Sequence, residues 1–186
     1  MTFSSEERDL LFKIAREAIA SCIGGGEPPS IDVPYEALCE KGRGAFVSLH
    51  KGKELRGCIG SFGSPTPLYE TISDMAVAAA TTDPRFEPLT PEELREVTLE
   101  ISVLTPLKKI GDVSEIEVGR DGIYIMKGAN KGVLLPQVAT EYGWEREQFL
   151  DHTCLKAGLK PGEWKDEGVA INPIEAEIFS EQRGGM

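Results

Sequence analysis

The sequence is short of positive charge. Its 186 residues carry 20 Lys and Arg against 31 Asp and Glu, which gives a formal net charge of −11. Proteins that bind nucleic acids or anionic membranes through charge alone neutralise phosphate groups with clustered Lys and Arg. This balance therefore argues against nucleic acid or a membrane surface as the partner. It leaves room for a local basic pocket.

Long apolar runs and targeting segments are missing as well. No stretch approaches the ~20 consecutive apolar residues that a membrane-spanning helix requires. Residues 1–7 contain no basic start followed by an apolar run, so no secretory signal is expected. We therefore expect a cytoplasmic protein whose thiols stay reduced.

Cysteine is scarce and scattered, at Cys22, Cys39, Cys58 and Cys154. None of these residues forms a C-x-x-C pair, so the sequence supports neither a disulfide framework nor a zinc ribbon, and no metal site is predicted. Glycine-rich phosphate-binding fingerprints are also absent, and the sequence indicates no particular cofactor. Three of the four cysteines are expected in the core, and Cys58 is the exception.

The pattern of apolar residues predicts helices and β-hairpins. Ser4 and Glu7 form a capping box that begins a helix over 5–23. Further helices are predicted at 34–38, from 68 to 79, from Thr90 and from Pro136. Hairpins are predicted from 45–50 with 55–59 and from 123–126 with 133–135, and single strands at 98–104 and 171–179. Because hairpins outnumber strand-helix-strand units, we predict one α+β domain over residues 1–186, with a mostly antiparallel sheet flanked by helices.

The most informative segment is Leu55–Phe62, in which two glycines bracket Cys58 at the end of a predicted strand. The two-residue period places Arg56 and Cys58 on one face and Gly57 and Ile59 on the other. A guanidinium beside a thiol stabilises the thiolate, which is the reactive form. In the alternative interpretation, Cys58 is a small buried apolar residue and the glycines permit close packing.

A second segment, Asp83–Pro88, is stiffened by two prolines. Arg85 in this loop presents a charged fork suited to carboxylate or phosphate, and Phe86 is expected to anchor the loop in the core. Alternatively, Arg85 forms a structural pair with an internal carboxylate such as Asp83 or Glu100. The sequence favours neither interpretation.

Histidine is not expected to act on Cys58. A tight hairpin turn pairs His50 with Leu55, three residues from Cys58 and roughly 10 Å away along the strand. His152 and Cys154 lie two residues apart on a predicted helix and point in different directions, so they do not share a metal.

The segment Leu55–Phe62 resembles the Leu-Arg-Gly-Cys-Ile-Gly signature of the AMMECR family, in the form called the AmmeMemoRadiSam system protein A type. The resemblance continues in family order through 83–88, 101–105, 122–125, 134–139 and 156–158. It implies an α+β fold with a larger and a smaller subdomain around an antiparallel sheet. It also implies a pathway shared with a Memo-like protein and a radical-SAM protein, but it implies no particular reaction.

Two functions follow, and the sequence leaves open whether the protein is an enzyme. In the first, the protein is an accessory or catalytic component of a modification pathway, Cys58 is a nucleophile or redox thiol, and a small anionic ligand binds beside it. The residues expected to contact that ligand are Arg56, Gly57, Ile59, Gly60, Arg85 and Phe86. In the second, the protein is a non-catalytic interaction module that docks on the Memo-like or radical-SAM partner.

Overall fold

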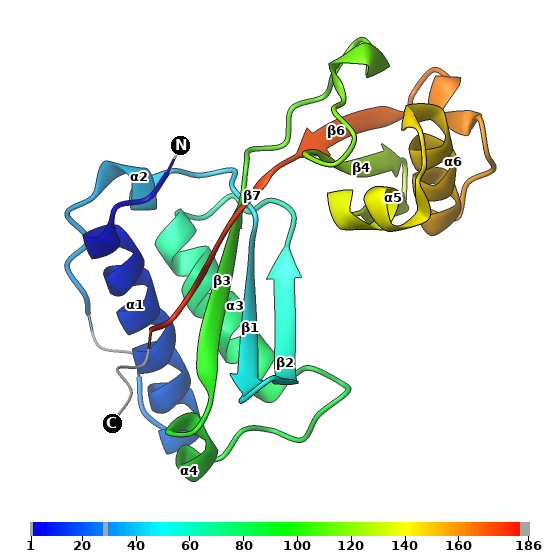
Figure 1. The fold of residues 1–186 in the computed structure, drawn as a ribbon. Helices are drawn as coiled ribbons and strands as arrows, with labels where there is room; N and C mark the ends of the chain where they lie inside the picture. The colour runs from blue at the N-terminus through cyan, green and yellow to red at the C-terminus, as the bar shows by residue number, and fades with distance from the viewer. Residues whose placement is uncertain (1, 28–29, 183–186) are drawn as a thin grey trace. The chain divides into compact units, whose positions relative to one another are not determined.

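The computed structural model describes residues 2–27 and 30–182, and its fold is α+β with two antiparallel sheets flanked by helices (Figure 1). The predicted fold class is confirmed. The chain divides into two compact units, one of residues 1–104 with 176–186 and the other of residues 105–175. We call them unit 1 and unit 2.

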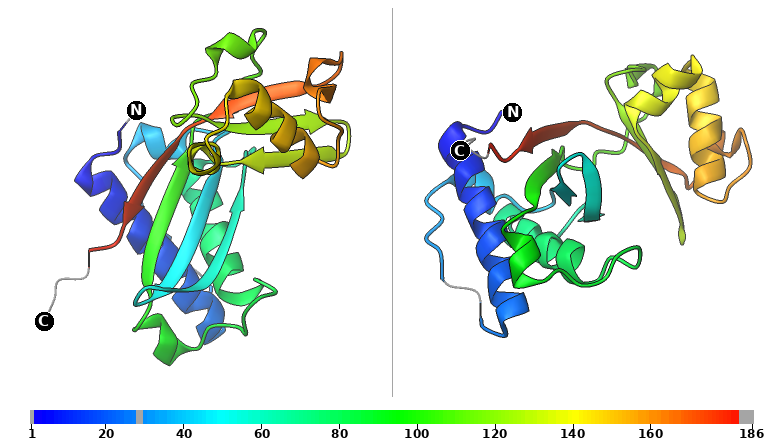
Figure 2. Two further views of the ribbon diagram at one scale, coloured as in Figure 1. Left: turned by 45° about the vertical axis from the view of Figure 1, so that its right-hand side comes forward. Right: turned by 60° about the horizontal axis from the view of Figure 1, so that its bottom comes forward.

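Unit 1 contains a four-stranded antiparallel sheet in the order β2-β1-β3-β7. Its strands are β1 (Ala45–Lys51), β2 (Glu54–Ser61), β3 (Thr98–Leu104) and β7 (Ala176–Ser180). Its helices are α1 (Ser5–Gly24), α2 (Glu36–Cys39), α3 (Leu68–Thr81) and α4 (Pro91–Leu94). Figures 1 and 2 show α1 and α3 against the same face of this sheet.

Local signals explain where the long helix α1 begins and ends. The Ser4 side chain accepts the N–H of Glu7 while the Glu7 carboxylate accepts the N–H of Ser4, so the predicted capping box is confirmed. Gly25 ends the helix with a φ of 73°, a conformation that glycine adopts without steric cost. The apolar face between these two ends packs into the core of unit 1.

The two faces of the unit 1 sheet differ in character. Val47, Leu49, Leu99 and Ile101 are fully buried on the face that the helices cover. Because side chains alternate along a strand, the residues between them point to the opposite face. The register places one row of such residues side by side across the four strands: Cys58, Ser48, Glu100 and Ser180.

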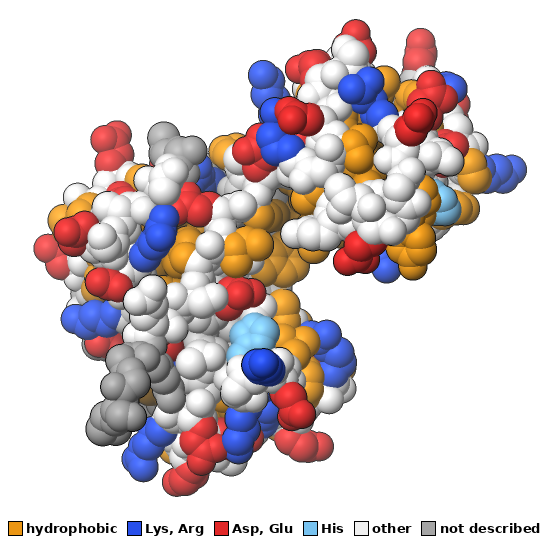
Figure 3. All heavy atoms as spheres, in the orientation of Figure 1, with side chains coloured by type: hydrophobic (Ala, Val, Ile, Leu, Met, Phe, Trp, Pro, Cys, Tyr) orange, Lys and Arg blue, Asp and Glu red, His pale blue; other side chains and the backbone are white. Residues whose placement is uncertain are grey.

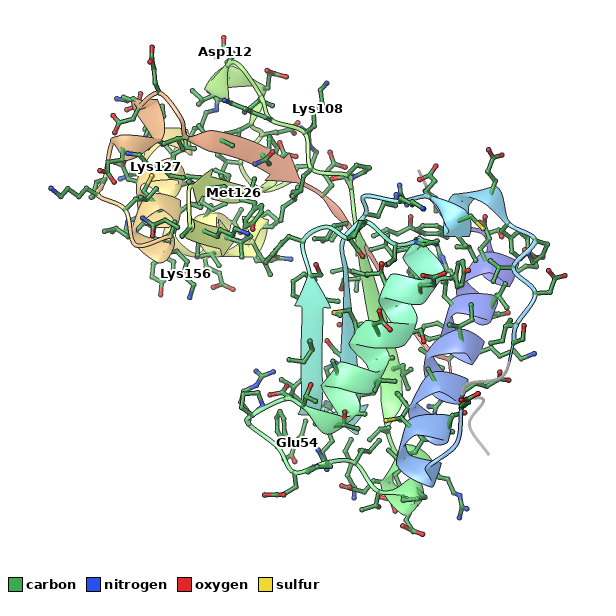
Figure 4. The ribbon with its side chains drawn as sticks, turned by 180° about the vertical axis from the view of Figure 1, so that it is seen from behind. Glu54, Lys108, Asp112, Met126, Lys127 and Lys156 are labelled. Carbon is green, nitrogen blue, oxygen red and sulfur yellow. The ribbon has the colours of Figure 1, made fainter. Side chains whose placement is uncertain are left out.

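Unit 2 has its own sheet and core. The strand order is β5-β4-β6, formed by β4 (Gly122–Lys127), β5 (Asn130–Leu134) and β6 (Ala170–Ile174). Helices α5 (Pro136–Tyr142) and α6 (Arg146–Lys156) and the short 3₁₀ helices η1 (Val113–Glu115) and η2 (Glu163–Lys165) complete the unit. Lys127, the last residue of β4, forms ion pairs with Asp166 at 3.0 Å and Glu163 at 3.8 Å; Figure 4 labels it.

Two expectations from the sequence were wrong. The strand predicted over 171–179 is two strands, β6 and β7, which belong to different sheets because the chain passes from unit 2 to unit 1 between them. Cys22 and Cys39 are exposed rather than buried, since each lies at the end of a helix; Cys154 is buried as expected.

The surface is mixed in charge. Figure 3 shows acidic and basic side chains interspersed over the face that it draws. In the described part of the chain, every helix is too short or too polar to span a bilayer.

Candidate functional site

Cys58 lies on β2, the strand that forms one border of the unit 1 sheet. Its partner across the strand pair is Ser48 of β1, and the Ser48 hydroxyl donates a hydrogen bond to Cys58 Sγ at 3.1 Å. The residue is only partly buried. The Ser48 hydroxyl therefore places a hydrogen-bond donor directly at the Cys58 sulfur.

The backbone of Cys58 is held from the other side by the loop of residues 83–88. Asp83 Oδ2 accepts the Cys58 N–H at 2.8 Å, and Arg85 Nη2 donates to the Cys58 carbonyl at 3.1 Å. These are the two bonds that a neighbouring strand would otherwise make. The loop therefore covers the edge of the sheet at the cysteine.

Asp83 and Arg85 also bind each other. Arg85 Nε and Nη2 donate to the two carboxylate oxygens of Asp83 at 2.9 and 2.7 Å. The Asp83 side chain is 1% exposed, whereas that of Arg85 is 54% exposed. Of the two alternatives for Arg85, the pair with an internal carboxylate is present, with Asp83 as the partner, while half of the Arg85 side chain still faces solvent.

The charges of this pair reinforce each other. The side-chain hydrogen bonds from Arg85, followed by the Cys58 N–H, hold the pKa of Asp83 well below its usual range. The pKa of Arg85 is raised, first by the hydrogen bond to Asp83 and to a smaller degree by the Cys58 side chain. A cation therefore stays next to the cysteine under ordinary conditions.

Arg56 precedes the cysteine but is held by a different partner. Its Nε and Nη2 donate to the two carboxylate oxygens of Glu93, each at 3.0 Å, and this pairing lowers the pKa of Glu93. A bulge at Leu49 and His50 leaves Arg56 without an opposite residue on β1. Arg56 is thus paired with Glu93 of α4, and the guanidinium that binds Cys58, through its backbone carbonyl, is that of Arg85.

Phe86 lies between the two arginines. The guanidinium carbons of Arg56 and Arg85 are 5.8 and 5.5 Å from its ring centroid, within the range of cation–π attraction. The ring is only partly buried, and Leu89, at 3% exposure, is the residue that anchors this loop in the core. The prediction that Phe86 anchors the loop in the core was therefore wrong, because its ring contacts the guanidinium groups of Arg56 and Arg85 instead.

The motif's other residues have packing positions. A Cβ on Gly57 would lie 2.2 Å from the Ala79 carbonyl oxygen, so only glycine allows α3 to approach β2 here. Ile59 packs against the same core. Gly60 lies under the ring of Phe46, where a Cβ would meet ring atoms at 2.2 Å.

The structure thus brings four of the predicted residues together on one border of the sheet: Arg56, Cys58, Arg85 and Phe86. Figure 4 labels Glu54, where the border strand β2 begins. Gly57 and Ile59 face the helices instead. Sequence reasoning missed Ser48 and Glu93. The hairpin register was the available signal for Ser48, but Glu93 lies 37 residues from Arg56 and no local pattern joins them.

His50 pairs with Leu55, as predicted from the tight turn. Its Nε2 atom is buried and has no hydrogen-bond partner among the described residues. In the same part of the chain, no three His, Cys, Asp or Glu side chains are grouped as metal ligands would be.

The edge strand carries the sequence Leu-Arg-Gly-Cys-Ile-Gly, and a loop of sequence Asp-Pro-Arg-Phe covers it. In an α+β chain, these two features are typical of an AMMECR-type protein. The family model described as AMMECR1 matches residues 12–179, so the chain belongs to the AMMECR1 family. The resemblance to the AMMECR family, which the motif indicated, is confirmed.

Relatives and a solved structure agree with this assignment. The chain is 44% identical to Protein MK0488 of Methanopyrus kandleri, over 95% of this chain and 89% of that protein. It is also 44% identical to Protein MJ0810 of Methanocaldococcus jannaschii, over 95% and 90% of the two chains. The crystal structure of the uncharacterized protein PH0010 from Pyrococcus horikoshii is similar, with a TM-score of 0.74 and 40% identity over 93% of this chain and 90% of that chain.

Proposed function

We propose that this protein is a catalytic or accessory component of a modification pathway and that Cys58 is its reacting group. The observation that carries the proposal is the environment of Cys58: a hydroxyl donates to its sulfur, and two side chains fix its backbone. Such preorganisation is typical of a functional thiol, whereas a cysteine that merely fills space needs no donor.

The ligand in this proposal is a small anion, held by Arg85. Part of that guanidinium is committed to Asp83 and to the Cys58 carbonyl, but the side chain remains 54% exposed. Carboxylate and phosphate groups match the planar fork of arginine. Arg56 contributes less, since both carboxylate oxygens of Glu93 already occupy it, and Phe86 fixes the direction of both cations.

The partners in this proposal are a Memo-like protein and a radical-SAM protein, as the family resemblance implies. A non-catalytic docking role on those partners is the second candidate. The observation that favours it is that both guanidinium groups near the cysteine are paired with carboxylates of the same chain. If docking is the whole function, Cys58→Ala retains full binding to the partner.

Competitive alkylation tests the proposal. The full chain is treated with a limiting amount of iodoacetamide near neutral pH, and the modification of each cysteine is followed by mass spectrometry. Cys22 and Cys39 are exposed and serve as internal references for ordinary thiols, while buried Cys154 reports unfolding.

We expect Cys58 to react faster than both references although it is less accessible. Inorganic phosphate should slow its alkylation in the wild type but not in Arg85→Gln. If Cys58 reacts more slowly than Cys22 and Cys39, its use as a reacting thiol is rejected.

A further inference from the structure

The strand β7 forms the second border of the unit 1 sheet (Figures 1 and 2). Backbone groups in an antiparallel ladder turn alternately toward one neighbour and away from it. Because the Glu181 N–H donates to the Leu99 carbonyl at 2.9 Å, the alternation turns the N–H and C=O of Ile178 and Ser180 away from β3. In the described chain no further strand pairs with this border.

The two borders of the sheet are treated differently. On β2 the outward groups of Cys58 are bonded by Asp83 and Arg85. On β7 the outward residue Ile178 has a 53% exposed side chain. An open edge with an exposed apolar residue is a template for an added strand.

A groove of about 840 Å³ runs beside β7, between the end of this strand and α1. Three phenylalanines line it: Phe3 and Phe12 each pack edge to face on Phe179, at centroid distances of 6.2 and 5.6 Å. A strand added to β7 would lie along this groove. Every second side chain of that strand would then point toward the aromatic group.

The charges in the groove favour an acidic occupant. Arg16 is fully committed, to Glu181 and to the carbonyls of Leu94 and Val97. Arg8 binds Glu177 through Nη2 at 2.9 Å. Lys13 is 60% exposed and lies 3.9 Å from its neighbour Glu17. The Arg8 side chain is 36% exposed, so two cationic side chains, Arg8 and Lys13, reach solvent at this groove, which Asp9 also lines. They do so in a chain whose net charge is −11.

We propose that the free edge of β7, with the groove beside it, binds an extended acidic segment of a partner protein as a fifth strand. Backbone hydrogen bonds to Ile178 and Ser180 supply the affinity. Carboxylates at alternate positions of the segment meet Arg8 and Lys13, and the intervening apolar side chains lie beside Ile178. This surface does not involve Cys58, so it stands whether or not the thiol reacts.

The test uses two labelled synthetic peptides of about eight residues, a common strand length. One alternates Glu and Val, the other alternates Lys and Val, and binding to the full chain is measured by fluorescence anisotropy. The first variant is Ile178→Pro, which removes an outward N–H without removing a bond to β3. Its matched control is Ile178→Thr, which keeps the N–H.

We expect the Glu peptide to bind and the Lys peptide to fail. Ile178→Pro should weaken binding about tenfold or more, and Ile178→Thr by no more than about threefold. The double variant Arg8→Gln/Lys13→Gln should weaken it by a similar factor and reduce its dependence on salt. If circular dichroism shows that Ile178→Pro fails to fold, the double variant alone tests the proposal.

Three results would overturn the proposal. The first is that the Glu peptide binds no better than the Lys peptide. The second is that a folded Ile178→Pro variant binds the Glu peptide like wild type. The third is that the double variant Arg8→Gln/Lys13→Gln binds it like wild type. A dimer in sedimentation that Ile178→Pro dissociates would replace the partner peptide by a second copy of this chain. Alkylation of Cys58 should be the same in every β7 variant, which separates this result from the test of the thiol.

Discussion

Asp83 Oδ2 accepts the backbone N–H of Cys58 at 2.8 Å, so a buried carboxylate stands where a neighbouring strand would have placed a carbonyl. Arg85 completes the arrangement by donating to the carbonyl of the same cysteine. Because Pro84 lies between these two residues and fixes its own φ, the loop loses little freedom when it binds the strand. Three consecutive residues thus replace a strand at the position of the motif's cysteine.

The first prediction concerns the pH dependence of this arrangement. Arg85 and the Cys58 N–H hold the pKa of Asp83 below its usual range, whereas an unfolded aspartate titrates near pH ~3.9. The stabilisation is therefore fully present above that pH and is lost as the pH falls through the lower folded value. We expect wild type to exceed Asp83→Asn in free energy of unfolding at neutral pH, and the difference to shrink in strong acid.

Urea unfolding at the two pH values measures this difference. Asp74→Asn is the control, since Asp74 is an exposed residue of α3 outside this arrangement. A difference between wild type and Asp83→Asn that stays constant with pH would show that Asp83 acts through shape and not through charge.

The second prediction concerns the close approach of α3 to β2. In Gly57→Ala the new Cβ would meet the Ala79 carbonyl oxygen at 2.2 Å, and backbone atoms must move to admit it. Overpacking of this kind costs about 1–3 kcal/mol, which denaturant unfolding detects. Gly24→Ala is the matched control: a Cβ there meets nothing within 4 Å, so the change should be neutral or slightly stabilising.

The parts of the fold that were predicted depend on local signals. The capping box at Ser4, the turn between β1 and β2 and the proline that begins α5 at Pro136 are each encoded within a few residues. What was missed depends on distant partners. The alternation over 171–179 is the same whether those residues join one sheet or two, because only the core that each residue meets decides between them.

The same division applies to the site. The motif and the Arg85 loop were identified from residue types, and the pairing of Arg85 with Asp83, two residues away, was among the alternatives. The sequence did not identify Glu93 as the partner of Arg56, because Glu93 belongs to a separate helix whose position depends on tertiary packing. The bulge beside Arg56 also has no signature in the strand pattern.

The third prediction concerns that pair. Arg56 and Glu93 form two parallel hydrogen bonds with side chains 15% and 28% exposed. A double-mutant cycle of Arg56→Gln and Glu93→Gln should give a coupling free energy of about 1–2 kcal/mol. Lys51 and Glu96 provide the comparison, since both side chains are 55% exposed.

For that exposed pair, the same cycle should give a smaller coupling free energy than for Arg56 and Glu93, because solvent screens the charges. Equal coupling energies for the two pairs would contradict the role assigned to burial and to the two-bond geometry. In that case Arg56 would be as available to a ligand as any surface cation.

The last prediction concerns the hydroxyl beside the thiol. Ser48 donates to Cys58 Sγ at 3.1 Å, and a hydrogen bond of this kind contributes about 1 kcal/mol. If the bond stabilises the thiolate, Ser48→Ala should slow the alkylation of Cys58 about fivefold near neutral pH, while the rates at exposed Cys22 and Cys39 stay unchanged. Ser102→Ala is the control, because Ser102 lies on the same face of the sheet, two residues along β3 from the row that contains Ser48. A rate at Cys58 that stays equal or rises in Ser48→Ala would mean that the hydroxyl only fills space, and activation of the thiol would then have to come from Arg85 alone.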